Sequence, residues 1–287
     1  MKEVLGVYQA ARPHWVGDGF PVRNIFSYNT FGQHISPFLL LDYAAPYQFT
    51  PGKTPRGVGQ HPHRGFETVT IAYQGEVSHR DSSGGGGTIR EGDVQWMTAG
   101  AGVIHEEFHS EEFTASGGTF EMVQLWVNLP AKDKMTPGRY QSLTKADIPV
   151  LNLGDDAGTL RVIAGAYADT AGPAQTFSPI DIWDVKLNAG KRVTFHAAAG
   201  RHVAVVVLRG AVRVNDDHEL RNASLAILDQ QAGAFSIDAA EDTTLLVLSG
   251  EPLNEPIEGY GPFVMNTPLQ IREAMDDFNA GRFGTIS

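Results

Sequence analysis

The chain has 287 residues, of which 42% are hydrophobic and 19% are charged, as in ordinary globular proteins rather than disordered or fibrous chains. It carries 22 Lys and Arg against 33 Asp and Glu, a formal net charge of −11, so we expect no direct binding to nucleic acid. The absence of cysteine excludes disulfides, thiolate nucleophiles and sulfur metal ligands. Any metal must be held by histidine, carboxylate or water.

The ends and the apolar runs of the chain give no membrane signal. Residues 1–5 lack the apolar stretch of a secretion signal, and the longest apolar runs, such as residues 203–208, are too short to span a bilayer. The sequence therefore predicts a soluble, cytoplasmic protein with no membrane partner.

Taken in chain order, short alternating apolar segments are separated by glycine and proline turns about every ten residues, which is typical of an all-β protein. Clear strands are expected at residues 68–73, 122–129 and 244–248. The length suits two domains. Because residues 130–138 are polar and carry two prolines, we place the linker there, with an N-terminal domain at 1–133 and a C-terminal domain at 134–287.

A glycine turn follows an apolar strand in each half, at Gly75 and at Gly210, which favours an internal duplication. Two similar β units without intervening helices would most simply form two jelly-roll barrels in tandem. The one clear helix lies near the C-terminus, where Thr267 and Gln270 form a capping box. We expect it to pack an apolar stripe on a barrel, formed by Ile271, Met275 and Phe278.

Two pairs of possible metal ligands stand out in the first half of the chain. His61 and His63 lead into a strand, and in an extended chain they would share the odd-numbered face, pointing into the barrel with Val69, Ile71 and Tyr73. His105 and Glu107 repeat the same spacing, so the two pairs could converge on one ion. A His-x-His pair alone is a weak signal. The order of pair, turn, strand and second pair is more specific.

Several runs together resemble the pirin family of the cupin superfamily. They begin with His61-Pro62-His63-Arg64-Gly65-Phe66 and continue through residues 92–100, 105–107, 124–130 and 261–267. The resemblance implies two fused cupin barrels with one metal ion in the N-terminal barrel, held by His61, His63, His105 and Glu107. The general cupin pattern would instead use Glu67, which stays an alternative ligand, whereas Glu106 should point away.

The remaining histidines are expected to lie outside the metal site. The second half has no comparable set, so the C-terminal barrel is predicted to be metal-free, and pirins are similar in this respect. We expect surface or turn positions for His109, His196, His202 and His218. His79 could lie next to the metal ligands.

Three imidazoles and a carboxylate suit iron, nickel, cobalt, copper, manganese or zinc, and the resemblance favours iron as Fe²⁺. It also implies quercetin 2,3-dioxygenase activity, the opening of a flavonol or related enediol by dioxygen, with Glu107 as ligand and proton acceptor. Phe66, Phe108, Met122 and Trp126 could wall the substrate pocket or belong to the core. The alternative is a non-enzymatic metal-binding regulator that binds a protein partner in transcription or metabolism.

Overall fold

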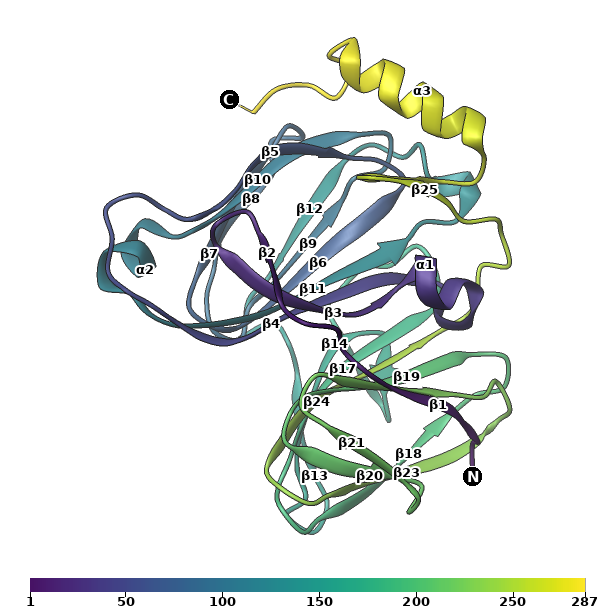
Figure 1. Ribbon diagram of the computed structural model, residues 1–287. Helices are drawn as coiled ribbons and strands as arrows, with labels where there is room; N and C mark the ends of the chain where they lie inside the picture. The colour runs from purple at the N-terminus through teal and green to yellow at the C-terminus, as the bar shows by residue number, and fades with distance from the viewer. Residues whose placement is uncertain (287) are drawn as a thin grey trace. The chain divides into compact units, whose positions relative to one another are not determined.

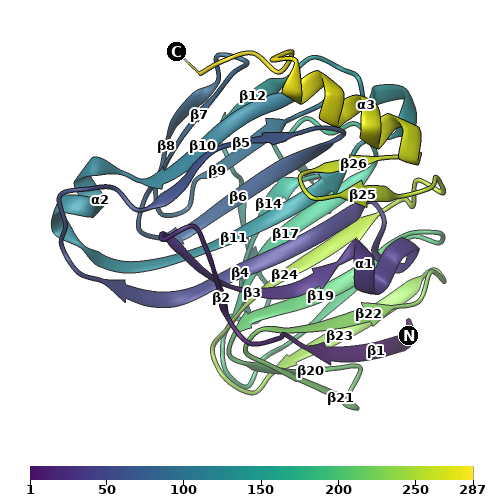
Figure 2. The same ribbon diagram turned by 45° about the horizontal axis from the view of Figure 1, so that its top comes forward.

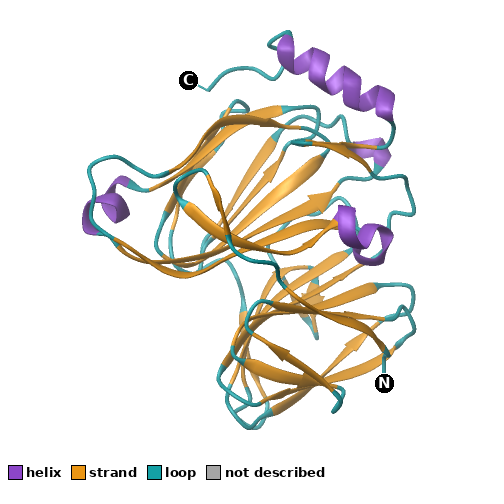
Figure 3. Ribbon diagram, viewed as in Figure 1, coloured by secondary structure: helices purple, strands orange, loops and turns teal. Residues whose placement is uncertain are grey.

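The computed structural model describes residues 1–286, and most of its regular structure is β-strand (Figure 3), which confirms the all-β prediction. The chain forms two compact units, each with its own sheets (Figure 1). We call them the N-terminal barrel, residues 12–24, 38–145 and 254–286, and the C-terminal barrel, residues 1–11, 25–37 and 146–253. Among the described residues, every helix is too short or too polar to cross a membrane.

The N-terminal barrel combines a seven-stranded and a four-stranded sheet. In spatial order the larger sheet contains β12 (Arg139–Leu143), β9 (Val94–Thr98), β6 (Phe66–Gln74), β11 (Gly118–Asn128), β4 (Phe38–Phe49), β3 (Phe20–Ser27) and β2 (His14–Val16). The smaller contains β5 (Gly57–His63), β10 (Val103–His109), β7 (Val77–Asp81) and β8 (Gly86–Ile89). Beside them lie α2 (Glu111–Ser116), η2 (Ala131–Asp133), the hairpin β25 (Glu258–Tyr260) and β26 (Phe263–Met265), and α3 (Pro268–Asn279).

The C-terminal barrel repeats this architecture. Its seven-stranded sheet contains β1 (Val4–Gln9), β22 (Ser224–Leu228), β19 (His202–Arg209), β24 (Thr243–Gly250), β17 (Ile180–Leu187), β14 (Gly158–Ala164) and β13 (Val150–Leu153). Its four-stranded sheet contains β18 (Arg192–Ala197), β23 (Gly233–Ala239), β20 (Ala211–Val214) and β21 (His218–Arg221). The connections hold α1 (Tyr28–Phe31), η1 (Gly32–Ile35) and a small hairpin of β15 (Ala166–Tyr167) and β16 (Thr170–Ala171).

The two strand orders correspond position by position. The order β5-β10-β7-β8 in one small sheet matches β18-β23-β20-β21 in the other, and the large sheets match in the same way. Gly75 joins β6 to β7 and Gly210 joins β19 to β20, with φ angles of 81° and 99° that favour glycine. The two turns named in the sequence are therefore equivalent, which supports an internal duplication.

The division of the chain differs from a single boundary at 133/134. β1 pairs with β22 and so belongs to the C-terminal barrel, whereas β12 pairs with β9 and belongs to the N-terminal barrel. The two strands occupy equivalent sheet edges. Since an edge strand is recruited by hydrogen bonding across space, chain order does not determine which sheet it completes.

The C-terminal segment returns to the N-terminal barrel, where α3 lies beside β25 and β26 (Figure 2). The expected capping box is present, because the Gln270 amide donates to the Thr267 hydroxyl while the Thr267 amide donates to the Gln270 side chain. The predicted stripe is wrong in part. Ile271 is buried together with Ala274, but Met275 and Phe278 stay exposed.

A buried lysine ties together three segments of the N-terminal barrel. The ammonium of Lys134, which is 1% exposed, donates to the Asn128 side chain at 2.7 Å and to the carbonyls of Gly65 at 2.7 Å and Val264 at 2.9 Å. These bonds use all three ammonium donors. They join the segment after β11, the bend between β5 and β6, and the returning strand β26.

Lys134→Met should lower the free energy of unfolding by about 2–4 kcal/mol, because a side chain of similar length would leave three buried acceptors without a donor. Urea denaturation monitored by circular dichroism measures this. Lys132→Met is the matched control, since Lys132 is exposed two residues away and its replacement should change the stability by about 0.5 kcal/mol or less. Equal losses in both variants would contradict this role for Lys134.

Candidate metal centre

Strand β10 supplies the centre of the site because it is paired on both sides. His105 lies opposite His61 of β5 and opposite Asp81 of β7, and Glu107 lies opposite His79. Side chains of a strand alternate between its two faces, so His105 and Glu107 share one face. The register thus brings His61, His79, His105 and Glu107 together.

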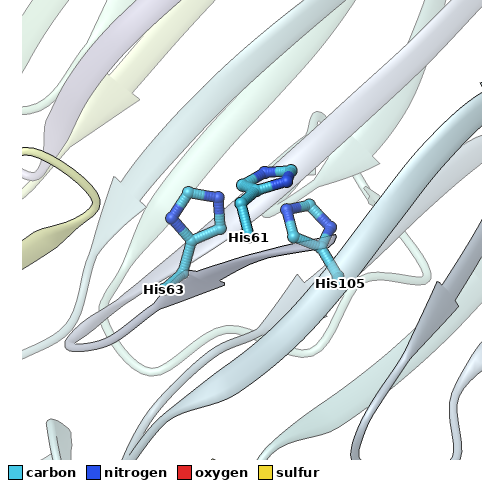
Figure 4. Close-up of side chains that lie close together, drawn as sticks. All are labelled: His61, His63 and His105. Carbon is cyan, nitrogen blue, oxygen red and sulfur yellow. The ribbon is translucent and has the colours of Figure 1, made fainter. Parts of the chain in front are cut away.

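Three of the predicted ligands form a tight cluster. One ligand atom from each of His61, His63 and His105 lies within 4.8 Å of the others, and the three rings come together where β5 meets β10 (Figure 4). Ring centroids are 4.2 Å apart for His61 and His105, 4.8 Å for His63 and His105, and 4.9 Å for His61 and His63. His63 and His105 are buried, whereas His61 is half-buried.

In each of these histidines Nδ1 is engaged away from the cluster. His61 Nδ1 donates to the Gly59 carbonyl at 2.8 Å, and His63 Nδ1 donates to the Pro262 carbonyl at 3.2 Å. His105 Nδ1 is 3.4 Å from His79 Nδ1, and its buried Nε2 has no hydrogen-bond partner among the described residues. Metal-binding histidines commonly bind through one ring nitrogen while the other N–H is held in this way.

The electrostatics of the cluster also fit a cation. Burial, with the neighbouring histidines, lowers the pKa of His63 to about 3 and holds the pKa of His105 well below its usual value. Both rings are therefore neutral near pH 7, which is the form that binds metal. The orphaned Nε2 of His105 and the neutral imidazoles together fit a divalent metal ion.

Glu107 belongs to a second group of possible ligands, together with His79 and His105. One ligand atom from each of these three residues lies within 4.8 Å of the others. Glu107 Oε1 accepts hydrogen bonds from Gln95 Nε2 at 2.5 Å and from Thr70 Oγ1 at 3.3 Å, which leaves Oε2 available for an ion. The four-ligand set with Glu107 stays a prediction. Gln95 and Thr70 were missed from the sequence, although Gln95 lies inside one of the family-like runs.

The alternate residues of β10 point to the opposite face. Glu106 accepts two hydrogen bonds from the Arg80 guanidinium, at 3.0 and 2.5 Å, and lies away from the histidines as expected. Phe108 shares that outer face, so its prediction as a pocket wall is wrong. Phe66 packs against Trp126 and His63, with ring centroids 4.3 and 5.0 Å away.

The predicted continuation of the odd-numbered face along β6 is also wrong. Gly65, with φ of 89°, bends the chain between β5 and β6 and resets the alternation. Thr70 consequently faces Glu107, and Glu67 lies on the other face, where its carboxyl accepts a hydrogen bond from Thr98 at 2.7 Å. Burial raises the pKa of Glu67 to about 7. Glu67 is in neither of the two ligand groups.

Of the remaining histidines, His109 is not a surface residue. It is 2% exposed, its ring contacts Phe49, Phe113 and Phe120, and its Nε2 donates to the Gly19 carbonyl at 2.9 Å. His196 is exposed as expected, and His202 and His218 are partly buried. Alternation places His109 on the inner face of β10 with Glu107, which an isolated sequence position did not reveal.

Two family models cover most of the chain. The Pirin model matches residues 19–127, and the model described as the Pirin C-terminal cupin domain matches residues 182–284. The chain belongs to the pirin family. It is 62% identical over 99% of both chains to a Pseudomonas aeruginosa protein whose name assigns it provisionally to quercetin 2,3-dioxygenase. A pirin-like protein of Solanum lycopersicum is 36% identical over 96% of this chain and 90% of its own length.

Solved structures agree with this assignment. A crystal structure named quercetin 2,3-dioxygenase from Acinetobacter baumannii is 63% identical, covers all of both chains and superimposes with a TM-score of 0.98. A pirin of Escherichia coli in complex with nickel is 22% identical, with a TM-score of 0.63 over 86% of this chain, and shows the shared fold. The expected bicupin architecture is therefore confirmed.

The second cupin barrel of this pirin has apolar side chains where the first has its polar cluster. The cross-strand pair of His61 and His105 corresponds to Phe195 and Phe235, whose rings are 5.6 Å apart. The register then matches Glu107 with Ile237 and His79 with Val214. All four C-terminal equivalents, Phe195, Val214, Phe235 and Ile237, belong to one buried apolar cluster. This contrast supports the prediction of a metal-free second barrel.

The protein purified without chelators should contain about one metal ion per chain, because only the first barrel offers clustered imidazoles among the described residues. His63→Ala should weaken metal binding by at least about tenfold. His196→Ala is the control, since His196 is exposed in the other barrel. Elemental analysis and chelator competition measure both. Two ions per chain, or equal losses in the two variants, would contradict the assignment.

Glu67→Gln should retain metal but change how stability depends on pH. Because the folded-state pKa of Glu67 is raised from 4.5 to about 7, its favourable contribution is complete below pH 4.5 and is lost as the pH rises through 7. Raising the pH from 5 to 8 should therefore stabilise the Gln variant, relative to wild type, by up to about 3 kcal/mol. Urea unfolding of the metal-free proteins tests this. A constant difference at both pH values would show that Glu67 titrates normally.

Proposed function

We propose that this pirin is a metal-dependent dioxygenase that uses dioxygen to open the heterocycle of a flavonol or a related enediol, with Fe²⁺ as its metal. The names of the Pseudomonas and Acinetobacter relatives support this reaction class. The ligand set proposed for the metal is His61, His63, His105 and Glu107. Nitrogen ligands with one carboxylate suit iron, and they would also accept nickel, cobalt, copper, manganese or zinc.

The observation that carries the proposal is a cavity of about 250 Å³ directly on the histidine cluster. Structural metal sites are closed, whereas catalytic sites keep an open position toward a substrate pocket. The cavity lining includes His61, His63, His105 and Glu107, together with Phe20, Val22, Asp42, Val58, Met122, Gln124 and Trp126. A metal that served only to stabilise the barrel would not need this space.

The cavity wall suits a flat aromatic molecule with hydroxyl groups. Phe20, Met122 and Trp126 offer apolar surface for rings. Asp42 and Gln124 offer hydrogen-bonding groups, and Asn24 holds the Asp42 carboxylate with a bond of 2.8 Å. In such a pocket the apolar walls bury the ligand and the few polar groups fix its orientation.

Glu107 is placed to move a proton in this cavity. A bound divalent metal would supply Lewis-acid activation of a substrate hydroxyl. Gln95 and Thr70 fix one carboxylate oxygen, so Oε2 can accept the hydroxyl proton within hydrogen-bond distance. The one hydroxyl proton of Thr70 is shared between Glu107 Oε1 at 3.3 Å and Gln124 Oε1 at 2.8 Å, so Thr70 connects Glu107 to the cavity wall. Burial excludes water and strengthens the effect of the carboxylate charge.

Glu107→Gln should lower flavonol turnover by about 10²-fold or more, since the amide keeps the shape but loses the charge and the basicity. Metal affinity should weaken as well. The assay is the aerobic loss of flavonol absorbance by metal-loaded protein, repeated without oxygen as a blank.

Glu106→Gln is the matched control, because Glu106 lies on the opposite face of the same strand and should affect neither turnover nor metal content. Wild-type protein that is loaded with metal but does not consume flavonol in air would contradict the proposal and favour a regulator that binds a protein partner. If Glu107→Gln retained both metal binding and turnover, another residue would have to be the proton acceptor.

A further inference from the structure

A buried chain of polar groups continues from the metal cluster to the turn between β7 and β8. His79 Nε2 lies 2.9 Å from Asp81 Oδ2, and His79 Nδ1 lies 3.4 Å from His105 Nδ1. His79 is 1% exposed, His105 1% and Asp81 4%. None of these contacts uses His105 Nε2, which is buried without a hydrogen-bond partner among the described residues.

The direction of this chain is determined at Asp81. Its Oδ1 accepts hydrogen bonds from the Ser83 amide at 2.8 Å, the Ser83 hydroxyl at 2.6 Å and the Gly85 amide at 3.0 Å. Three donors on one oxygen favour the ionised form of Asp81, a carboxylate that can only accept. His79 must therefore donate from Nε2, so a neutral His79 has Nδ1 free to accept. His105 must then donate from Nδ1, which leaves its Nε2 without a proton.

We propose that Asp81 and His79 are positioning residues that set the tautomer of His105, so that its Nε2 lone pair is directed at the metal. The inference rests on the ligand role proposed above for His105. Asp81 and His79 do not bind the metal in the proposed ligand set. Asp81 instead acts on His105 in two steps, through its hydrogen bond to His79 and the contact of His79 with His105.

The surroundings of the relay hold its geometry. The ring of Tyr140, on β12, stacks on His79 with centroids 5.1 Å apart and an interplanar angle of 18°. A Cβ atom at Gly85 would lie 2.5 Å from both Asp81 Oδ2 and Tyr140 Cβ, so glycine at this position leaves room for the carboxylate and the tyrosine to meet. His79 is thus held by the Asp81 carboxylate and by the stacked ring of Tyr140.

A simpler role for Asp81 is to cap the turn through Oδ1 alone, and Asp81→Asn separates the two roles. The asparagine can keep its carbonyl oxygen on Ser83 and Gly85, which places an NH₂ group where Oδ2 faced His79. That group can only donate, so His79 would have to accept at Nε2 and donate from Nδ1. His105 would then carry its proton on Nε2, the nitrogen that the metal needs.

The first test is nitrogen-15 NMR of the histidine rings in the metal-free wild-type chain, which reads tautomers without flavonol or oxygen. The proposal predicts Nε2–H for His79 and Nδ1–H for His105, and the reverse for both in Asp81→Asn. Zn²⁺ added to wild type should shift His105 Nε2 and leave His79 Nδ1 unmetallated. An Nε2–H tautomer of His105 in wild type, or a metal shift at His79 Nδ1, would overturn the proposal even if the variant did not fold.

The second test is metal affinity by chelator competition. Asp81→Asn should bind Zn²⁺ about 10–100-fold more weakly. Ser83→Ala is the matched control, because it removes one hydrogen bond from Oδ1 but leaves the contact of Oδ2 with His79, and it should bind as wild type does. Equal weakening in both variants would mean that Asp81 acts only through the turn. Since neither readout involves turnover, failure here is distinct from failure of the proposed dioxygenase reaction.

Discussion

The antiparallel pairing of β10 between β5 and β7 is the constraint on which the site depends. It places His105 opposite His61 on one side and beside the β7 pair of His79 and Asp81 on the other. Alternation then sends Glu107 inward and Glu106 outward to Arg80. A shift of one residue in this register would exchange the two faces and leave no imidazole of β10 in the barrel.

Segments that are distant in the sequence hold that register and orient the clustered histidines. The returning C-terminal segment places the Pro262 carbonyl on His63 Nδ1, and its Val264 carbonyl is tied to the Gly65 bend through Lys134. Arg64 adds a second connection, with bonds of 2.6 Å to the Ala101 carbonyl and 2.8 Å to Asp277 of α3. The C-terminal helix thus supports the chain segment that carries the histidine cluster.

The two barrels show that the fold alone does not make the site. Their strand orders correspond throughout, yet the positions that hold imidazoles and a carboxylate in one hold phenylalanine, valine and isoleucine in the other. Apolar side chains can fill the second barrel because they need no partners, whereas buried imidazoles and carboxylates must find a hydrogen bond or an ion. The hydrogen bond of Gln95 to Glu107 accordingly lies in the first barrel, whereas the position equivalent to Glu107 is the apolar Ile237 in the second.

Sequence patterns predicted much of this arrangement, and the misses share a physical cause. Spacing along one strand predicted that His105 and Glu107 share a face and that Glu106 does not, because alternation is a local property. The face of Glu67 was wrong because the bend at Gly65 resets alternation, and the burial of His109 was missed because its aromatic neighbours come from other strands. No local pattern encodes pairing across space. For this reason the sequence did not predict that β1 completes the C-terminal barrel and β12 the N-terminal barrel, or that Pro262 contacts His63.

The most direct test of the account is the location of the metal in crystals of protein loaded with a single divalent ion, from anomalous diffraction at its absorption edge. We expect one peak per chain, about 2.0–2.2 Å from the Nε2 atoms of His61, His63 and His105 and from a carboxylate oxygen of Glu107, with an open position toward the cavity. No peak should appear in the C-terminal barrel. A peak bound by His79 instead of His61 and His63, or a second peak among Phe195 and Phe235, would contradict it.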